Sequence, residues 1–219
     1  MELSKRLEAC LHYTVGFLHL ADIGTDHAFV PIEAVLRGHV QDAIAIDNKF
    51  GPYLQALNNV KKYMLKDRIK VRLGEGLEKI GEDTDVVVIS GLGGELIAKI
   101  LQDGDHKNVK RFVLQSNRNA DVVRKTAMEL GYHIADELVV EDAQKYYDVM
   151  VIERGRESYN HDQLEFGPIN LVQRPYHFIQ RLDHQIVQYH KILKNVETKE
   201  RQDEIKRQIK RLEDIINES

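Results

Sequence analysis

Short apolar segments alternate with amphipathic segments over the first two thirds of the chain. Continuous apolar runs predict buried strands, and apolar positions spaced by three and four residues predict helices. The run at 85–90 is apolar after its first residue, which suits a central parallel strand covered on both faces. Such alternation favours a doubly wound α/β sheet. We expect strands near 19–23, 42–47, 69–73, 85–90, 110–115, 132–139 and 146–153, and helices near 2–17, 28–37, 49–63, 93–102 and 119–130.

The last two expected strands are not separated by a long helix. Only the short segment 141–144 lies between them, so they are expected to form a hairpin that places an antiparallel strand in the sheet. A seven-stranded sheet that ends in a hairpin is typical of a Rossmann-like methyltransferase domain. It is less typical of a dehydrogenase or a flavodoxin.

The pattern changes after Gly155. A polar segment that resembles a linker is followed by apolar positions that step by three and four residues, first over 178–196 and then over 205–216. This spacing predicts an antiparallel helical hairpin with heptad-like seams. We therefore expect an α/β domain at 1–155 and a helical, coiled-coil-like C-terminal domain at 156–219.

The stretch 19–31 is the centre of the predicted chemistry. It is expected to form a strand, a tight turn at Gly24 and the start of a helix near Pro31, and free N–H groups at a helix start can meet a ligand. Acids at Asp22 and Asp26 stand where a dinucleotide site has glycines, and they would repel a pyrophosphate. A cationic cofactor without phosphate, such as S-adenosylmethionine, fits this turn. The alternative is an ordinary connection between a strand and a helix.

Polar clusters follow four more of the expected strands. Asp47 can accept from ribose hydroxyls or cap the next helix, and 74–77 can meet an adenine edge or form a glycine turn. The glycines of 90–94 allow close approach of a ligand or form a flexible loop. Gln115 and Asn117 are two residues apart, so they can face the same way. Since ligands bind beyond the carboxyl ends of parallel strands, all of these clusters can share one crevice.

Composition and charge limit the remaining possibilities. Residues 1–149 carry 19 Lys and Arg against 23 Asp and Glu, and residues 150–219 carry 12 of each, so a nucleic-acid surface would have to be a local patch. No apolar run approaches the ~20 residues of a membrane helix. The single Cys10 indicates a reducing compartment, and no Cys and His residues have zinc-site spacing. We expect a cytoplasmic protein without a metal.

Taken together, several motifs resemble the bacterial tRNA (adenine-22-N1)-methyltransferases. They are Asp-Ile-Gly-Thr-Asp-His-Ala at 22–28 with Pro31, Ile46-Asp47, Ser-Gly-Leu-Gly-Gly at 90–94, Leu-Gln-Ser-Asn at 114–117 and Phe-Gly-Pro at 166–168. The resemblance spans essentially the whole chain. It implies a class I methyltransferase domain followed by a coiled-coil-like domain, and transfer of a methyl group from S-adenosylmethionine to N1 of adenine 22 in tRNA.

The resemblance also implies roles for individual residues. Ser-Gly-Leu-Gly replaces the D-P-P-Y tetrad of amino-group methyltransferases, which puts methylation of an exocyclic nitrogen in doubt. The resemblance does not specify the catalytic residues; our candidates are Asn117, or a backbone carbonyl of the glycine loop, as acceptor from the adenine amino group, and His27, whose alternative is an ordinary histidine at a helix start. The implied cofactor-binding residues are Gly24, Asp26, His27, Asp47, Glu75, Gly76 and Gly91, and the candidate substrate-binding residues are Gly93, Gln115, Asn117 and Arg6.

Other functions remain compatible with the residues. A small-molecule methyltransferase could use the helical hairpin as a lid or a dimer seam, and a non-catalytic subunit could retain the fold. A dinucleotide-binding protein ranks last because of the acids in the first turn. Lys5, Arg6 and the basic residues between Lys191 and Arg211 form either a solvated surface or phosphate contacts. The expected partner is tRNA, without a membrane, and the protein is expected to be a monomer or a weak dimer through its C-terminal helices.

Overall fold

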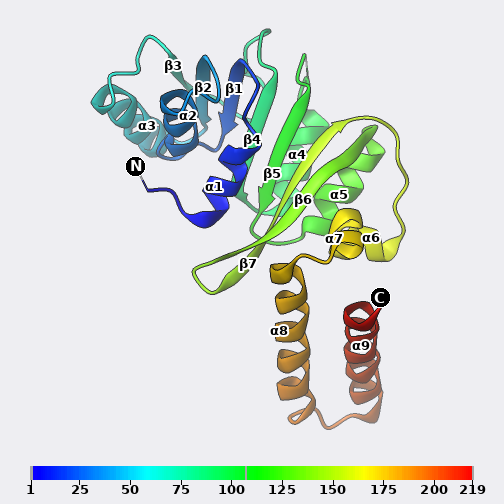
Figure 1. The fold of residues 1–219 in the computed structure, drawn as a ribbon. Coiled ribbons are helices and arrows are strands. Elements are labelled where there is room, and N and C mark those ends of the chain that lie inside the picture. The colour runs from blue at the N-terminus through cyan, green and yellow to red at the C-terminus, as the bar shows by residue number, and fades with distance from the viewer. Residues whose placement is uncertain (1, 107, 219) are drawn as a thin grey trace.

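One mixed sheet in the order β3-β2-β1-β4-β5-β7-β6 forms the centre of the computed structural model, which describes residues 2–106 and 108–218 (Figure 1). Strands β1 to β5 run parallel, and β7 runs antiparallel to both of its neighbours. The predicted sheet with a terminal hairpin is confirmed. The strands are β1 (His19–Ile23), β2 (Asp42–Asp47), β3 (Ile69–Leu73), β4 (Val86–Leu92), β5 (Arg111–Ser116), β6 (Tyr132–Asp142) and β7 (Lys145–Arg154).

Helices pack on both faces of the sheet, because its strands are apolar on both sides. In β4 the side chains of Val86 and Val88 belong to one core, and those of Val87 and Ile89 belong to the other. This alternation explains the unbroken apolar run in the sequence. The first core is covered by α1 (Lys5–His12), α2 (Phe29–Leu36) and α3 (Phe50–Lys62), and the second by α4 (Gly94–Asp103) and α5 (Ala120–Glu129).

Helix α1 is shorter than the helix expected at 2–17, so that prediction was wrong in length. The buried hydroxyl of Thr14 donates to the carbonyl oxygen of Leu11 at 2.7 Å, which offers the backbone an alternative to helix. The chain then turns at Gly16, where φ is +90°. The other helices of the sheet domain begin and end close to their predicted residues.

The hairpin of β6 and β7 is longer than expected, because its turn needs only two residues. Ala143 and Gln144 have φ of +48° and +62°, the left-handed conformation that two-residue hairpin turns require. β5 pairs with β7 only as far as Asp148, and β7 begins earlier, at Lys145. The tip of the hairpin therefore extends beyond the carboxyl end of β5.

The segment after β7 is fastened to the sheet domain. The Tyr159 hydroxyl accepts from the Ile134 N–H and donates to Glu157, both at 2.7 Å. Helices α6 (His161–Phe166) and α7 (Pro168–Gln173) then lie against α5 and β6. The predicted linker after Gly155 thus has no regular secondary structure but is held in place by side chains.

The predicted helical hairpin is formed by α8 (Tyr176–Leu193) and α9 (Lys199–Asn217) and projects away from the sheet (Figure 1). Its seam follows the predicted spacing with two differences. Val196 lies in the connection after α8, and Ile215 rather than Ile216 is buried. The buried side chains of the two helices are Phe178, Leu182, Ile205, Ile209, Leu212 and Ile215.

A buried ionic cluster joins the hairpin to the sheet domain. The Arg124 guanidinium, 0% exposed, lies 3.0 Å from Glu137 and 2.9 Å from Asp148. Asp148 also pairs with Arg181 of α8 at 2.7 Å, and Glu137 accepts from the Ile169 N–H at 2.9 Å. Burial alone would raise the pKa of Asp148, but the charges of Arg181 and Arg124 hold that pKa below its usual value. The cluster thus fixes α7 and α8 against α5, β6 and β7.

Candidate functional site

The turn after β1 is held against the end of β2. The N–H groups of Gly24 and Thr25 both donate to the Ile46 carbonyl oxygen, at 2.9 and 3.0 Å. Gly24 has φ of +71°, and Asp26 and Ala28 also have positive φ, of +50° and +57°. Non-glycine residues in this conformation cost free energy and cluster at functional sites. The turn is therefore strained at two non-glycine residues.

Asp22 lies beneath this turn, 3% exposed, and its carboxylate accepts from the Thr25 hydroxyl at 2.6 Å. Burial raises the pKa of Asp22 to about 7; the bond from Thr25 opposes this rise and the charge of Asp47 adds to it. This carboxyl group therefore gains and loses its proton near neutral pH.

Asp47 ends β2 and is 7% exposed. Its two carboxylate oxygens accept from the N–H of Asp26 at 3.3 Å and from the N–H of Lys49 at 2.9 Å. The N-cap of α3 is Lys49, so Asp47 is not the helix cap that the sequence left as an alternative. A carboxylate offers about four acceptor positions, so Asp47 retains acceptor capacity for a ligand.

His27 and Asp26 lie beside one another at the rim of the turn. His27 Nε2 is 3.4 Å from the Asp26 carboxylate, and the imidazole ring stacks on Phe29 at 4.8 Å. The Asn59 side chain donates to the His27 carbonyl oxygen at 2.9 Å and so ties α3 to the turn. Both His27 and Asp26 keep exposed side-chain surface from which they can meet a ligand.

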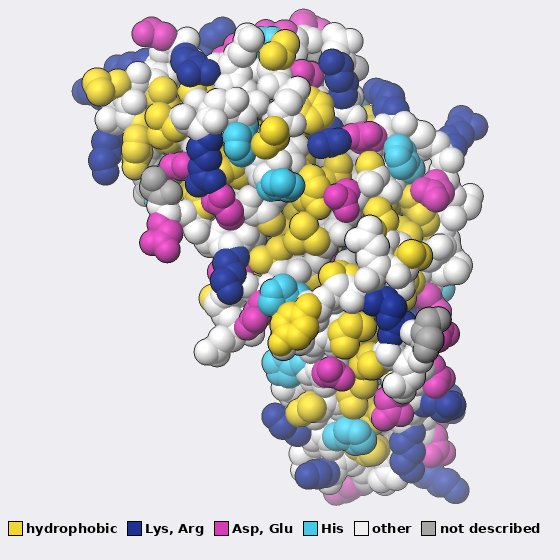
Figure 2. Space-filling model, viewed as in Figure 1, with side chains coloured by type: hydrophobic (Ala, Val, Ile, Leu, Met, Phe, Trp, Pro, Cys, Tyr) yellow, Lys and Arg dark blue, Asp and Glu magenta, His cyan; other side chains and the backbone are white. Residues whose placement is uncertain are grey.

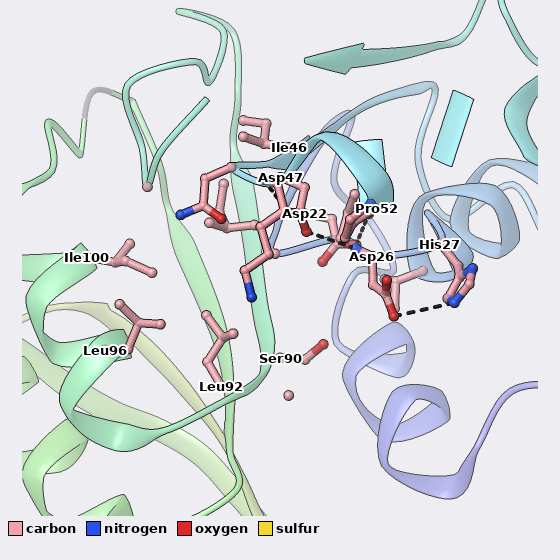
Figure 3. A pocket seen from close by; sticks show the side chains of 18 of the residues that line it. Asp22, Asp26, His27, Ile46, Asp47, Pro52, Ser90, Leu92, Leu96 and Ile100 are labelled. Carbon is pink, nitrogen blue, oxygen red and sulfur yellow. Dashed lines mark hydrogen bonds and ion pairs between the residues drawn. The ribbon is translucent and has the colours of Figure 1, made fainter. Parts of the chain in front are cut away.

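These groups surround a cavity of about 580 Å³, the cofactor cavity (Figure 3). Acids of the β1 and β2 ends line one part of it, and Leu92, Leu96 and Ile100 of β4 and α4 line another. A wall of carboxylates and a wall of aliphatic side chains suit a cationic ligand that also has a flat apolar part. Every residue predicted to bind the cofactor lines this cavity: Gly24, Asp26, His27, Asp47, Glu75, Gly76 and Gly91.

The carboxyl end of β4 around the bulge at Gly91, here called the Gly91 loop, is held by two amide side chains. Gln115, 0% exposed, accepts from the Gly91 N–H at 3.0 Å and from Arg6 Nη1 at 2.8 Å. Its amide nitrogen donates to Asn117 Oδ1 at 3.3 Å, and Asn117 Nδ2 donates to the Gly91 carbonyl oxygen at 2.7 Å. The structure thus places the predicted pair Gln115 and Asn117 together, but Gln115 lies beneath the loop and does not line the cofactor cavity.

Gly94 is required for close packing and was missed as a special position. A Cβ at Gly94 would lie 2.0 Å from the Asn119 carbonyl oxygen and 2.8 Å from that of Arg118. The loops after β4 and β5 can therefore touch only because residue 94 has no side chain. Gly93, a predicted substrate-binding residue, is the N-cap of α4 and lies outside the lining of the cofactor cavity.

Arg6 of α1 is the residue that connects the cofactor cavity to a neighbouring one. Besides Gln115, its guanidinium lies 3.7 Å from Asp142 and 5.6 Å from the ring centre of Tyr147. Arg6 lines both the cofactor cavity and a second cavity of about 610 Å³ between the β6–β7 turn and α8, which Asn117 also lines. The sequence identified Arg6 and Asn117 as substrate-binding candidates but missed the cavity that they line, because its other residues come from distant segments that share no motif.

Within residues 2–106 and 108–218, no group of three or more His, Cys, Asp and Glu side chains is placed to hold a metal ion. Over the same residues, no helix has the length and apolarity to cross a membrane.

Comparison with known proteins decides the family. A family model described as TrmK, tRNA (adenine(22)-N(1))-methyltransferase, matches residues 20–216. The chain belongs to this family. The tRNA (adenine(22)-N(1))-methyltransferase of Bacillus subtilis (strain 168) is 38% identical over 175 residues, which are 78% of this chain and 74% of that protein. The family resemblance expected from the sequence motifs is confirmed.

Solved TrmK-like structures share the whole architecture. A Streptococcus pneumoniae protein described as a candidate tRNA (m1A22) methyltransferase is 33% identical, with a TM-score of 0.93 over 99% of this chain and 100% of that one. Its complex with S-adenosyl-L-methionine has a TM-score of 0.90 with the same identity and coverage. M. capricolum TrmK with S-adenosyl-homocysteine is 29% identical, with a TM-score of 0.86 over 99% of each chain. The predicted Rossmann-like methyltransferase fold with C-terminal helices is confirmed.

Proposed function

We propose that the protein transfers a methyl group from S-adenosylmethionine to N1 of adenine 22 in tRNA. The observation that carries this proposal is the convergence of four strand-end clusters on one acid-lined cavity in a chain of the TrmK family. The carboxylates disfavour a phosphate-bearing dinucleotide. Family membership favours tRNA over the small-molecule substrate considered as an alternative.

The residues of the cofactor cavity fit S-adenosylmethionine. Asp47 retains acceptor positions for ribose hydroxyls, and the apolar wall around Leu96 and Ile100 suits an adenine ring. Asp26, exposed at the rim, suits the methionyl amino group. When bound, the cofactor supplies a methyl group activated by a sulfonium charge. Glu75, Gly76 and the other residues that line the cofactor cavity form the rest of its wall.

The protein groups act mainly by positioning the base. N1 of adenine has a free lone pair at neutral pH, so no side chain has to remove a proton from it before the methyl group is transferred. Alignment of two reactants accounts for roughly 7–11 kcal/mol of barrier reduction in well-oriented systems. Asn117 and the Gly91 carbonyl oxygen supply acceptors for the adenine amino group, which becomes a stronger donor as the ring becomes cationic. His27, on the rim, is the second candidate catalytic residue.

The target adenine has to leave its stack before it reaches the cavity, at a cost of a few kcal/mol. Contacts with phosphates offset this cost, and Arg6 and the C-terminal helices are the proposed sources. In this scheme residues 1–155 bind the cofactor and residues 156–219 help to hold the RNA. We infer a cytoplasmic location, since tRNA is the substrate.

The oligomeric state is proposed as a monomer or a weak dimer through α8 and α9. Val187 of α8 is an apolar side chain that is 49% exposed, and it is the proposed contact of such a dimer. Light scattering across a concentration series tests this. A stable dimer that survives Val187→Glu would contradict a seam on α8.

The function is tested with labelled S-adenosylmethionine and unmodified tRNA transcripts that carry adenine or guanine at position 22. Transfer to the adenine transcript alone, with 1-methyladenosine in the nuclease digest, is the expected result. The matched control enzyme is Asp47→Ala, which should bind the cofactor poorly. Equal transfer to both transcripts, or a different methylated nucleoside, would contradict the proposal.

A further inference from the structure

We propose that the second cavity, between the β6–β7 turn and α8, binds an unpaired nucleotide of the RNA substrate next to the target adenine. The proposal deepens the proposed function and rests on it. Two predicted substrate-binding residues, Arg6 and Asn117, line this cavity, but the other lining residues belong to no sequence motif. The proposal follows from the position of the cavity beside the cofactor cavity and from its cationic, aromatic and amide side chains.

The charge of the second cavity is opposite to that of the cofactor cavity. Its ten lining residues, all in the described part of the chain, include the cationic side chains of Arg6, Lys145 and Arg181 and no carboxylate. Asp148 partly neutralises Arg181 and Asp142 partly neutralises Arg6, whereas no ion pair of Lys145 is found among the described residues. A cavity lined by cations without a carboxylate is unusual in a chain with 35 Asp and Glu and 31 Lys and Arg residues. It favours an anionic ligand such as a nucleotide phosphate.

Aromatic rings line the same space. Tyr146 and His184 meet edge to face, with ring centres 6.2 Å apart and planes at 78°. Tyr147 lies under the Arg6 guanidinium at 5.6 Å. Proteins commonly bind unstacked RNA bases by stacking them on Tyr and His rings and on Arg guanidinium groups. The cavity therefore offers stacking surfaces close to its cations.

Amide side chains complete the lining. Gln144, Gln185 and Gln188 each carry a donor and an acceptor, as the edge of a base requires, whereas the Asn117 amide is engaged with Gly91 and Gln115. Gln188 already contacts His184, with a distance of 3.2 Å between Nε2 atoms, so it orients that ring. The volume of about 610 Å³ is within the usual range of pockets for molecules of nucleotide size.

The turn that forms one wall is rigid. Ala143 and Gln144 are both held at positive φ in a two-residue connection between two long paired strands. Two-residue hairpin turns require this backbone conformation, so the tight connection sets the path of the chain here. It keeps Gln144 and Lys145 at fixed positions opposite α8.

The position of Arg6 places the second cavity beside the methyl-transfer site. Arg6 lines both cavities, and Asn117, which holds the Gly91 loop, lines the second. An RNA strand whose target base enters at the Gly91 loop would carry a flanking nucleotide past Arg6. The flanking nucleotide is therefore the ligand that the geometry favours.

The exposed face of the helical hairpin is a weaker site for specific recognition. Figure 2 shows Lys and Arg interleaved with Asp and Glu over α8 and α9. Several of these form pairs along one helix, such as Arg201 with Glu204 and Lys210 with Asp214. Arg211 is engaged by Asp162 and Glu165 of α6. The second cavity has the more uniform positive charge.

Binding of unmodified tRNA and of S-adenosylmethionine is measured at pH 8 for the full-length wild-type protein and three variants. His184→Ala and Tyr146→Leu remove rings of the second cavity, and the leucine keeps the apolar packing beneath Tyr146. His190→Ala is the matched control, since His190 is also exposed on α8 but does not line the cavity. We expect Kd for tRNA to rise about 5- to 150-fold in Tyr146→Leu, the range for loss of one stacked base. His184→Ala should show a smaller rise, and His190→Ala should leave that Kd within about 2-fold, a shift well below loss of one stacked base.

Photocrosslinking supplies an independent readout. A transcript with 4-thiouridine on one side of adenine 22 should crosslink to the peptide around Tyr146 or to that around His184. Unchanged tRNA affinity in Tyr146→Leu and His184→Ala, or crosslinks only elsewhere, overturns the proposal while methyl transfer by the wild type still supports the proposed function. Conversely, weakened tRNA binding in these variants with no methyl transfer by the wild type would support the second cavity and contradict the proposed function.

Discussion

The cofactor cavity and the second cavity lie side by side but are lined by side chains of opposite charge. The first is lined by the carboxylates of Asp22, Asp26 and Asp47 together with aliphatic side chains, and the second by cations, aromatic rings and amides. Among the residues that the structure describes, only Arg6 lines both cavities. The difference shows how a protein with a net charge of −4 can hold a cationic cofactor and a polyanionic substrate within reach of each other.

The largest effect is expected from a substitution that disrupts only the cofactor cavity. Asp47→Ala removes the proposed ribose acceptor and leaves the Asp26 and Lys49 N–H groups without their acceptor. Kd for S-adenosylmethionine should rise about 100-fold or more, since hydrogen bonds to a charged group contribute about 1.5–3 kcal/mol each. Calorimetric titration measures this. Asp67→Ala, at an exposed turn, is the control, and an equal loss of tRNA affinity in Asp47→Ala would mean that the two cavities are not separate.

The next effect concerns the residue that the two cavities share. Arg6→Ala removes a charged donor to buried Gln115 and a wall of both cavities, so kcat/KM for tRNA should fall about 30-fold. Affinity for both ligands should decrease. The neighbouring exposed Lys5→Ala is the matched control. If Arg6→Ala weakens only one ligand, Arg6 belongs to that cavity and does not link the two.

A smaller effect is expected beneath the loop. Gln115→Leu leaves the Gly91 N–H without its acceptor, which costs about 1–3 kcal/mol. Gln115 positions the loop without lining either cavity. We therefore expect kcat to fall about 10-fold, which corresponds to a free energy near the lower end of that range. Kd for S-adenosylmethionine and Kd for tRNA should stay nearly unchanged. Gln115→Glu keeps an acceptor for Gly91 and Arg6 and should recover part of the rate. A change in Kd without a change in kcat would contradict this assignment.

The smallest effect is a pH dependence. The folded pKa of Asp22, about 7, is above its ordinary 3.8, so the folded state binds the extra proton between these values. The contribution of this group to stability is therefore present at low pH and is lost as pH rises from about 4 to about 7. Ionised Asp22 favours a cationic ligand, so affinity for S-adenosylmethionine should rise a few-fold as pH passes 7.

Asp22→Asn tests both halves of this pH prediction. Denaturant unfolding and calorimetric titration between pH 5 and 8 should show a flatter profile in the variant than in the wild type. Parallel profiles in the two proteins would show that another group titrates.

The sequence predicted the sheet well because local periodicity determines it. The apolar run of β4 and the helical spacing of α8 and α9 are local signals, whereas the length of α1 depended on a side-chain bond of Thr14. The cofactor residues were also accessible, since parallel strands bring their carboxyl ends to one edge. The second cavity was not, because Arg6, Tyr146 and His184 meet only through tertiary packing. Gln115 shows a further limit: a polar residue at a strand end can be a buried support.

The ionic cluster around Arg124 changes how the C-terminal helices can be studied. A chain cut after Gly155 would lose Arg181 and the N–H groups that donate to Glu137, and would uncover the apolar side chain of Val139, which packs against residues of the removed part. Loss of one partner from a buried ion pair destabilises a protein by about 3–5 kcal/mol. The helical hairpin is thus not a detachable module. A chimaera that takes its C-terminal helices from a relative should therefore take residues 148 and 181 from the same parent, so that this ion pair is kept.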